Sequence, residues 1–281
     1  MIVAYLTESY YTWAELFLKS WKITNDNNEK IYLNTRNLKI PQIKNLKDIY
    51  PNVIVENKIL SVKELSKKHD MPENIITVSK NDCDGGKTTG KHRLWMNITA
   101  DGDRIESLLE VIKKNRNTDE KYFIHMDIDV LFRGKIDDIK SKSIINDVGL
   151  IIRKERKVTD PSKLGVTASG KNKDSLIAIG CVCIGNTDNG QRFVEEWVKI
   201  VNSKPMKMRN HCKWGQYAIL QAFINLKKEV GWKWFRLPYG EFNAGLVDKP
   251  HAKVWYFKKK NKKTSILKAR QELKRLGGLK K

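Results

Sequence analysis

The sequence predicts an α/β protein with an open, mostly parallel sheet flanked by helices, a Rossmann-like arrangement. Short apolar runs typical of buried strands alternate along the chain with segments whose apolar residues recur at helical spacing. The 281 residues, of which 40% are hydrophobic, are enough to bury one large core. Since no internal repeat and no clear linker is visible, we expect a single domain over residues 1–257 and a basic tail over 258–281.

The strands are expected where apolar runs are bounded by turn residues. In chain order these runs cover residues 2–6, 31–33, 53–55, 123–132, 148–153, 176–185, 232–238 and 252–257. Apolar spacing predicts helices at residues 13–21, 101–114, 191–201 and 214–226. A further helix is expected to begin at Ser61, because Glu64 follows three residues later and completes a capping box.

Two carboxylates interrupt the apolar run FIHMDIDVLF at residues 123–132. Alternate residues of a strand project from the same face, so Asp127 and Asp129 are expected to point together. Carboxylate oxygens are hard ligands suited to Mg²⁺ or Mn²⁺, and such an ion usually also binds substrate phosphates. The pair therefore indicates a metal site for a diphosphate at the carboxyl edge of the sheet. The alternative is a strand-end cap or an ion pair with Arg133.

A second motif competes for the same carboxylates. GGKTTGKH, at residues 85–92, has the spacing of the phosphate-cradling loop of NTPases, and Asp127 would then help to position magnesium. The position after Lys91 should carry a hydroxyl for the metal, but it is occupied by His92. The same residues also suit an ordinary flexible loop. A P-loop kinase or NTPase is thus an alternative function.

The chain carries 54 Lys and Arg against 32 Asp and Glu, a formal net charge of +22. Such an excess attracts polyanions, which include nucleic acid, anionic lipid and acidic glycan. Residues 257–281 alone hold eleven Lys or Arg and the single acid Glu272. This tail is expected to be either a solvated helix or an arm that binds anions. A non-catalytic nucleic-acid-binding protein is a further alternative.

No apolar run is long enough to span a membrane and the amino terminus lacks a secretory signal, so a cytoplasmic protein is expected. The four cysteines are then expected to be free thiols, with Cys181 and Cys183 on one face of a core strand and Cys83 and Cys212 elsewhere. The Lys-, Asn- and Ile-rich composition suits a virus or phage gene, whose product would work in the host cytoplasm.

Over most of residues 1–257 the order of features resembles the GT-A glycosyltransferases, which transfer sugars from nucleotide diphosphates. The similar pieces, in chain order, are IVAYLTESY, GKHRLWMN, YFIHMDIDVLFRG, IAIGCVCIGNTDNGQRFVEEW, KWGQYAIL and KPHAKVWYFKKK. No piece is specific alone, but six follow the order of the family. The resemblance implies a GT-A-like fold, a nucleotide-sugar donor and a bound Mn²⁺ or Mg²⁺.

The resemblance also implies roles for residues at the matching positions. Asp127 and Asp129 would hold the metal, and His251 would complete its shell unless it is a structural residue. Tyr10 would stack on the base unless it serves in packing, and the basic residues would offset the diphosphate charge. The residues implied around the nucleotide and its phosphates are Thr7, Tyr10, Lys91, Arg93 and Lys258.

The acceptor side departs from the family pattern. Gln216 lies at the matching position and is the implied catalytic residue there, but Gly215 stands where many members carry an acid. An inverting reaction needs a general base, for which Asp248, Glu241 and Asp174 are candidates, whereas a retaining enzyme could work without one.

The expected function is metal-dependent transfer of a sugar from a nucleotide-diphosphate sugar to an acceptor hydroxyl. The positive charge favours a polyanionic acceptor, and the most specific version is hydroxymethylated DNA with the target base flipped into the site. A glycan or lipid-linked acceptor at an anionic membrane surface explains the basic tail equally well.

Overall fold

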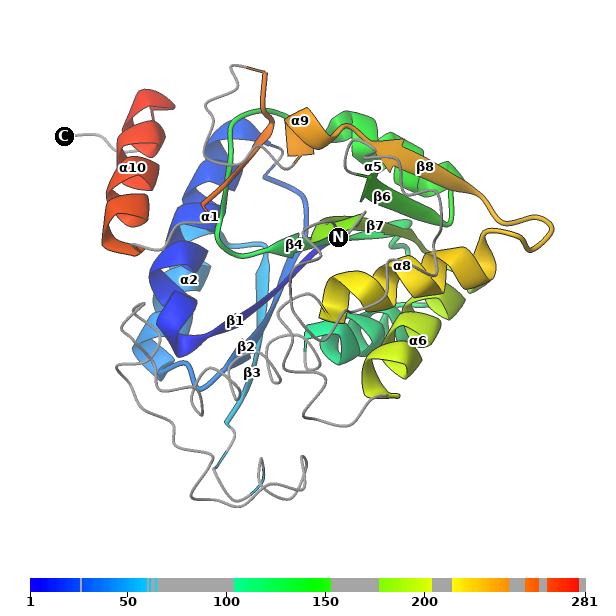
Figure 1. The fold of residues 1–281 in the computed structure, drawn as a ribbon. Coiled ribbons are helices and arrows are strands. Elements are labelled where there is room, and N and C mark those ends of the chain that lie inside the picture. The colour runs from blue at the N-terminus through cyan, green and yellow to red at the C-terminus, as the bar shows by residue number, and fades with distance from the viewer. Residues whose placement is uncertain are drawn as a thin grey trace, which may run out of the picture.

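The main sheet combines strands from both halves of the chain (Figure 1). The computed structural model describes residues 1–25, 27–59, 61, 64, 104–152, 177–203, 214–242, 251–257 and 262–277. Within these ranges the strands of the main sheet are β1 (Ile2–Thr7), β2 (Ile31–Arg36), β3 (Val53–Lys58), β4 (Tyr122–Asp127), β6 (Val148–Ile152), β7 (Ile177–Gly185) and β8 (Trp234–Leu237). Their order is β3-β2-β1-β4-β7-β6-β8. Every pairing in this sheet that does not involve β7 is parallel, which confirms the mostly parallel sheet.

Helices cover both faces of this sheet (Figure 1). Those described are α1 (Tyr11–Thr24), α2 (Ile40–Ile49), helical residues 104–114, α5 (Asp137–Ile145), α6 (Asp188–Asn202), α8 (Trp214–Leu226), α9 (Tyr239–Phe242) and α10 (Lys262–Arg275), with the short 3-10 turn η1 (Glu8–Tyr10) before α1. The predicted capping box is confirmed, because Ser61 N donates to Glu64 Oε2 at 2.8 Å and Glu64 N donates to Ser61 Oγ at 3.2 Å.

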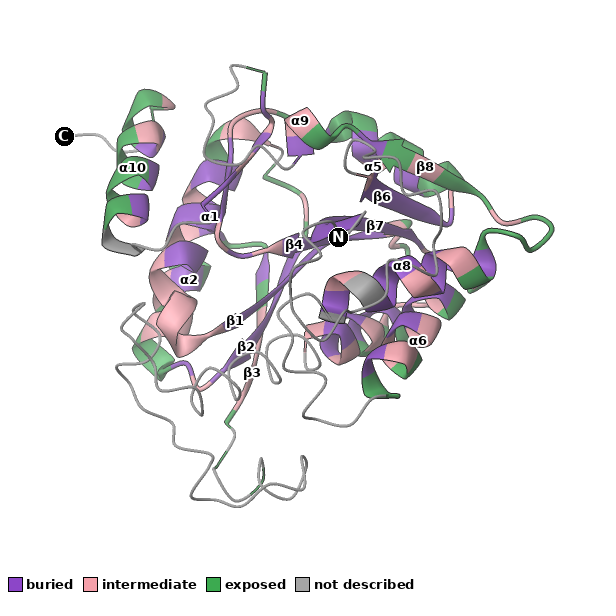
Figure 2. Cartoon of the chain, in the orientation of Figure 1, coloured by how far each residue is buried: buried purple, intermediate pink, exposed green. Residues whose placement is uncertain are grey.

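Alternation along the strands divides the core into two layers. Ile2, Ala4 and Leu6 of β1 pack in the layer that contains α1, α2 and α10. Val3 of the same strand faces the other way, into the layer formed with residues 104–114, α6 and α8. Figure 2 shows the central strands buried along most of their length. A sheet covered on both faces explains why its strands are continuous apolar runs rather than alternating ones.

Two cysteines lie in the layer on the α1 side. Cys181 and Cys183 of β7 are free, buried thiols in the same apolar cluster, which confirms the predicted shared face. A hydrogen bond to Cys183, together with burial, raises the pKa of the Cys181 thiol well above its usual value. Cys181 therefore stays neutral, and both residues contribute to packing. Cys83 and Cys212 lie outside the described residues.

The predicted single strand over residues 123–132 is wrong. β4 ends at Asp127, and the chain bends through residues 128 and 129 before β5 (Val130–Phe132) begins. β5 belongs to a separate two-stranded sheet, in which it runs antiparallel to β9 (Val254–Tyr256). Because residues 128 and 129 are not part of a strand, strand alternation does not place the Asp127 and Asp129 side chains on one side.

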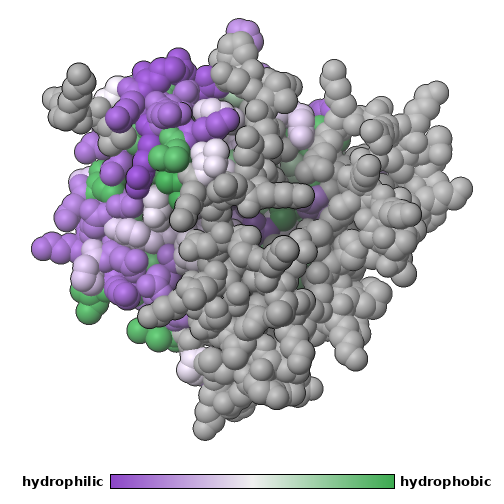
Figure 3. Space-filling model, turned by 60° about the vertical axis from the view of Figure 1, so that its left-hand side comes forward, coloured by the Kyte–Doolittle hydropathy of each residue, from purple (hydrophilic) through white to green (hydrophobic). Residues whose placement is uncertain are grey.

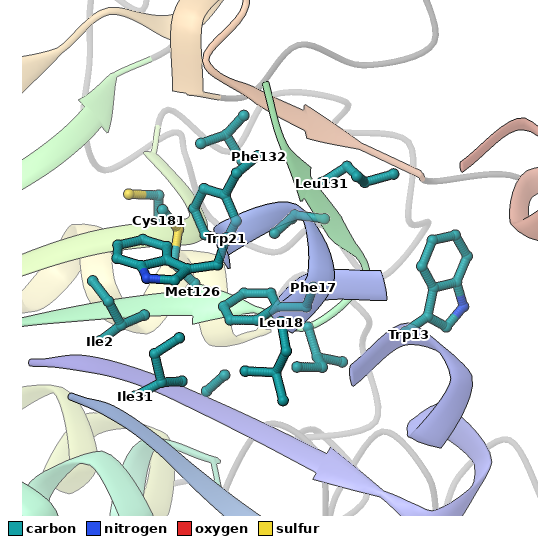
Figure 4. Packing of buried hydrophobic residues seen from close by; sticks show 14 of the residues in the cluster. Ile2, Trp13, Phe17, Leu18, Trp21, Ile31, Met126, Leu131, Phe132 and Cys181 are labelled. Atoms are coloured by element: carbon teal, nitrogen blue, oxygen red, sulfur yellow. The ribbon is translucent and has the colours of Figure 1, made fainter. Parts of the chain in front are cut away.

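The bend has a packing cause (Figure 4). Phe132 is fully buried and meets the rings of Phe17 and Trp21 edge-on, at centroid distances of 5.0 and 4.8 Å. Its backbone N–H donates to Ser20 Oγ of α1 at 3.1 Å. Burial of one aromatic side chain is worth about 2 kcal/mol, and edge-on ring pairs add to it. Leaving the main sheet thus lets β5 bury its residues between α1 and β9.

The predicted basic tail contains helix α10, which packs against α1. Ala269 and Leu273 are buried, and Glu272 accepts from Arg133 Nε at 2.8 Å in a largely buried ion pair. The side chains of Lys268 and Lys274 are exposed on the opposite side, as are those of Arg270 and Arg275. The helix is therefore docked by one face and presents positive charge on the other.

The surface on this side of the molecule is mainly hydrophilic where it is described, with isolated apolar side chains (Figure 3). Leu267 of α10 and Ile40 of α2 are the kind of single exposed apolar residues that need no special explanation. None of the helices in the described ranges combines the length and apolar character needed to cross a membrane.

Candidate functional site

The candidate site lies where β1, β2 and β4 end side by side. These strands are parallel neighbours, so their carboxyl ends meet at one edge of the sheet. Tyr5 pairs in register with Asp127, and Thr7 pairs with Arg36. The edge therefore brings together a carboxylate, a hydroxyl and a guanidinium that are far apart in the sequence.

The Asp127 carboxylate is paired with a guanidinium. Arg104 Nη1, at the first described residue of the helix over 104–114, donates to Asp127 Oδ1 at 2.5 Å. The two side chains are only 13% and 14% exposed, so solvent screens the pair poorly. Arg104 thus supplies part of the positive charge that offsets the two neighbouring carboxylates. Arg133, the partner considered from sequence, forms its ion pair with Glu272 instead.

His125 lies two residues before Asp127 and is buried. Neither ring nitrogen has a hydrogen-bond partner among the described residues. Burial, together with the positive charge of Arg104, lowers the pKa of His125 to about 3, and the negative charge of Asp127 opposes this less strongly. The imidazole is therefore neutral, and it adds no positive charge beside the carboxylate.

Tyr256 is a member of this site that sequence reasoning missed. Its side chain is buried, and burial followed by the negative charges of Asp127 and Asp129 raises the pKa of its phenol well above the usual value. The phenol thus stays protonated as a hydrogen-bond donor beside both carboxylates. In the sequence, AKVWYF shows only an apolar strand, and nothing in it indicates pairing with residues more than a hundred positions earlier.

A second buried guanidinium lies at the same edge. Arg36 donates to Ser107 Oγ at 3.0 Å and to the carbonyl of Thr35 at 3.0 Å, and it also bonds the Asn34 side chain. Its guanidinium lies 5.1 Å from the centre of the Tyr5 ring. Because Ser107 belongs to the helix over 104–114, these contacts tie that helix to β2 beside Arg104. The sequence offered no signal for this role.

The nucleotide residues predicted on the β1 side lie at its end. Thr7 is the last residue of β1, and its hydroxyl is 2.9 Å from Ser9 Oγ. Tyr10 is half-buried and packs against the core cluster on the α1 side. Packing and a role in a nucleotide pocket are compatible for such a partly exposed ring.

The remaining predicted residues are dispersed or not described. Gln216 is half-buried near the start of α8, and His251 is exposed. Among the described residues no three His, Cys, Asp or Glu side chains gather as a metal shell, so His251 is not brought together with the two aspartates. The predicted residues that lie outside the described ranges are Lys91, Arg93, Asp174, Asp248 and Lys258, together with the whole of GGKTTGKH.

The residues present suit a hard divalent cation that is shared with a ligand. Asp127 and Asp129 provide carboxylate oxygens, which Mg²⁺ and Mn²⁺ prefer. Such an ion commonly uses one or two carboxylates and takes its other ligands from phosphates and water, so a third protein ligand is not required.

The chain shares its fold with solved GT-A glycosyltransferases. It matches the galactosyltransferase LgtC in complex with donor and acceptor sugar analogues, with 13% identity, a TM-score of 0.51, and coverage of 100% of this chain and 97% of that one. It matches the apo bifunctional glycosyltransferase WbbM with 9% identity and a TM-score of 0.52, covering 98% of this chain and 51% of that one.

A third solved structure with this fold is the glycosyltransferase GlyE of Streptococcus pneumoniae TIGR4, with 11% identity, a TM-score of 0.51, and coverage of 92% of this chain and 54% of that one. The chain thus spans about half the length of WbbM and GlyE. The predicted GT-A-like fold is confirmed by these similarities. No protein-family model matches the chain, and no curated protein sequence matches it.

Breaking the Arg104–Asp127 pair should cost much more than breaking an equally short exposed pair. Arg116 Nη2 also lies 2.5 Å from a carboxylate, that of the 93% exposed Asp188. We expect Arg104→Gln to lower the free energy of unfolding by about 3 kcal/mol, because it strands a poorly solvated charge. Arg116→Gln should cost less than about 1 kcal/mol. Urea unfolding at neutral pH measures the free energy of unfolding of both variants. Equal losses would contradict the conclusion that solvent screens the Arg104–Asp127 pair poorly.

The neutral state of His125 should appear as a pH dependence of stability. The unfolded chain binds a proton at this imidazole below about pH 6.5, whereas the folded protein resists it down to a pKa of about 3. Stability is therefore lost as the pH falls through this window, by about 1.4 kcal/mol per pH unit. His125→Gln should reduce the slope of unfolding free energy between about pH 6 and pH 4 by that amount. An unchanged slope would refute a buried neutral histidine.

Proposed function

We propose that the protein is a metal-dependent glycosyltransferase that moves a sugar from a nucleotide-diphosphate sugar to an acceptor hydroxyl. The observation that carries this proposal is the position of Asp127 and Asp129, at the carboxyl edge of the parallel strands of a GT-A fold. Ligands of open α/β sheets bind at this edge. LgtC was solved in complex with donor and acceptor sugar analogues, so a protein with this fold binds both kinds of molecule.

In the proposed reaction Asp127 and Asp129 would hold the metal near the donor diphosphate. Bound Mn²⁺ or Mg²⁺ would supply positive charge against the charge that develops on the leaving nucleoside diphosphate. Arg104 orients the Asp127 carboxylate through its 2.5 Å contact. Lys91, Arg93 and Lys258 are proposed to add further positive charge around the phosphates.

The donor nucleotide is proposed to lie against Thr7 and Tyr10 at the end of β1. On the acceptor side we propose Gln216 as a group that contacts the acceptor and Asp248 as the general base of an inverting reaction. His251 is proposed to approach the metal only when donor and ion are bound. Loops of enzymes commonly complete a site on ligand binding, as closure excludes water.

For the acceptor we propose a polyanion, with hydroxymethylated DNA favoured. The support is the net charge of +22 and the exposed basic side of α10, which carries Lys268, Arg270 and Lys274. Phosphate contacts of this kind position a protein on DNA without reading its sequence. A phage or viral source would fit, because such a protein would meet modified DNA in the host cytoplasm.

Asp129→Asn tests the metal and donor parts together. With Mn²⁺ and a panel of nucleotide sugars, we expect one donor to raise the melting temperature of the wild-type protein, since a ligand at about a hundred times its Kd adds about 2.7 kcal/mol. Asp129→Asn should lose this shift and all transfer activity, while the matched exposed variant Asp119→Asn should keep both.

Two results of the same panel would overturn the proposal. A metal-dependent shift that survives Asp129→Asn would remove Asp129 from the site. Stabilisation by ATP alone, abolished by Lys91→Ala, would assign the protein to the P-loop class instead.

The exposed basic side of α10 can be tested by the salt dependence of DNA binding. Replacing Lys268, Arg270 and Lys274 by Gln should reduce the slope of log affinity against log salt by about 2 to 3, because each phosphate contact contributes about 0.9. A matched triple replacement on α6 and just beyond the end of α8, at Lys199, Lys227 and Lys228, should leave the slope unchanged.

Equal effects of the two triple variants would contradict a specific basic surface. Loss of binding to anionic lipid vesicles, with DNA binding retained, would instead assign the α10 surface to a membrane and favour a lipid-linked acceptor.

A further inference from the structure

Strand β9 lies directly against the bend that carries the second carboxylate. Phe257 N donates to the carbonyl oxygen of Asp129 at 3.2 Å, and Tyr256 pairs in register with Val130 of β5. The backbone of residues 129 and 130 is therefore held by a strand from near the other end of the chain. Tyr256 projects its side chain from the position next to this contact.

The Tyr256 side chain has room only because residue 180 is glycine. A Cβ on Gly180 of β7 would overlap both the phenol oxygen and the ring of Tyr256, closer than real Cβ atoms approach any neighbour. The ring thus lies directly on the backbone of β7. Tyr256 is 1% exposed, so its hydroxyl reaches the end of β4 through the protein interior and not through solvent.

The Tyr256 hydroxyl lies near both the Asp127 and the Asp129 carboxylates. Met126 of β4 pairs in antiparallel register with Cys181 of β7, so Gly180, on which the phenol lies, is opposite Asp127. Burial, and after it the negative charges of Asp127 and Asp129, raise the pKa of Tyr256 well above its usual value. A phenol carries one O–H donor, so from this position it can donate to a carboxylate at the end of β4. A charge-assisted hydrogen bond of this kind is roughly twice as strong as a neutral one.

We propose that Tyr256 is a positioning residue that holds Asp127 against the Asp129 bend for the divalent ion, and that Gly180 is required because it admits the phenol. The inference rests on the proposed metal-dependent function. It adds to that function a residue of β9 that orients a metal ligand without itself binding the metal. Groups that orient metal ligands in this way typically affect metal affinity by about ten- to a hundred-fold.

Tyr256→Phe removes the hydroxyl and leaves the ring on Gly180. The matched control is Tyr50→Phe, because Tyr50 is equally buried and its hydroxyl donates to the carbonyls of Asn27 and Glu29 at 2.9 and 2.6 Å, before the start of β2. Binding of Mn²⁺, alone and with UDP or GDP, is titrated by electron paramagnetic resonance of the free ion, and folding of each variant is checked by urea unfolding.

We expect Tyr256→Phe to bind Mn²⁺ at least about tenfold more weakly than the wild-type protein, with Tyr50→Phe unchanged even though it also loses hydrogen bonds. Gly180→Ala should weaken Mn²⁺ binding at least as much, because it displaces the ring. Wild-type affinity in Tyr256→Phe, or an equal loss in both tyrosine variants, would overturn the positioning role alone. A wild-type protein that binds Mn²⁺ neither alone nor with UDP or GDP would overturn both this inference and the metal dependence of the proposed function.

Discussion

The site depends on the pairing of one carboxylate, Asp127, that is largely removed from water. Asp127 ends β4, next to the helix over 104–114, strand β1 and strand β9. Arg104 supplies the opposite charge, and Tyr256 supplies a neutral donor. Burial of an unpaired carboxylate would cost several kcal/mol, so the folded state needs these partners beside Asp127.

The bend after Asp127 shows how packing and chemistry share the same residues. The chain leaves the main sheet because Val130, Leu131 and Phe132 are buried between α1 and β9, where the Phe132 ring contacts two aromatic rings of α1. Burial of these apolar side chains requires the backbone to turn at residues 128 and 129. A polar residue placed in such a bend is presented beyond the end of the strand, and here that residue is Asp129. The hydrophobic core thus positions a hydrophilic group.

The carboxyl-terminal segments hold this arrangement from outside. β9 bonds the backbone of the bend, and α10 is fastened to Arg133, directly after β5, by the ion pair with Glu272. Glu272 is the only acid in residues 257–281, and its side chain points toward the domain, where it pairs with Arg133. The side chains of Lys268, Arg270 and Lys274 are exposed, so their charge is directed to solvent. This division lets a strongly basic segment fold onto the domain and still offer positive charge to an anionic partner.

The sequence alone determined the layered α/β architecture, because apolar period acts locally. Most of the predicted strands and helices match the observed ones within a few positions, but α2 and α5 were not predicted. It also indicated Asp127 and Asp129 as candidate site residues, since two acids in an apolar run are conspicuous. Only the tertiary structure decided that the run breaks between them, because the break comes from contacts with α1 and β9 that lie far away in sequence. The same is true of Arg36, Arg104, Gly180 and Tyr256. Each is an ordinary residue in its own segment, and each acquires its role from a long-range contact that no local pattern encodes.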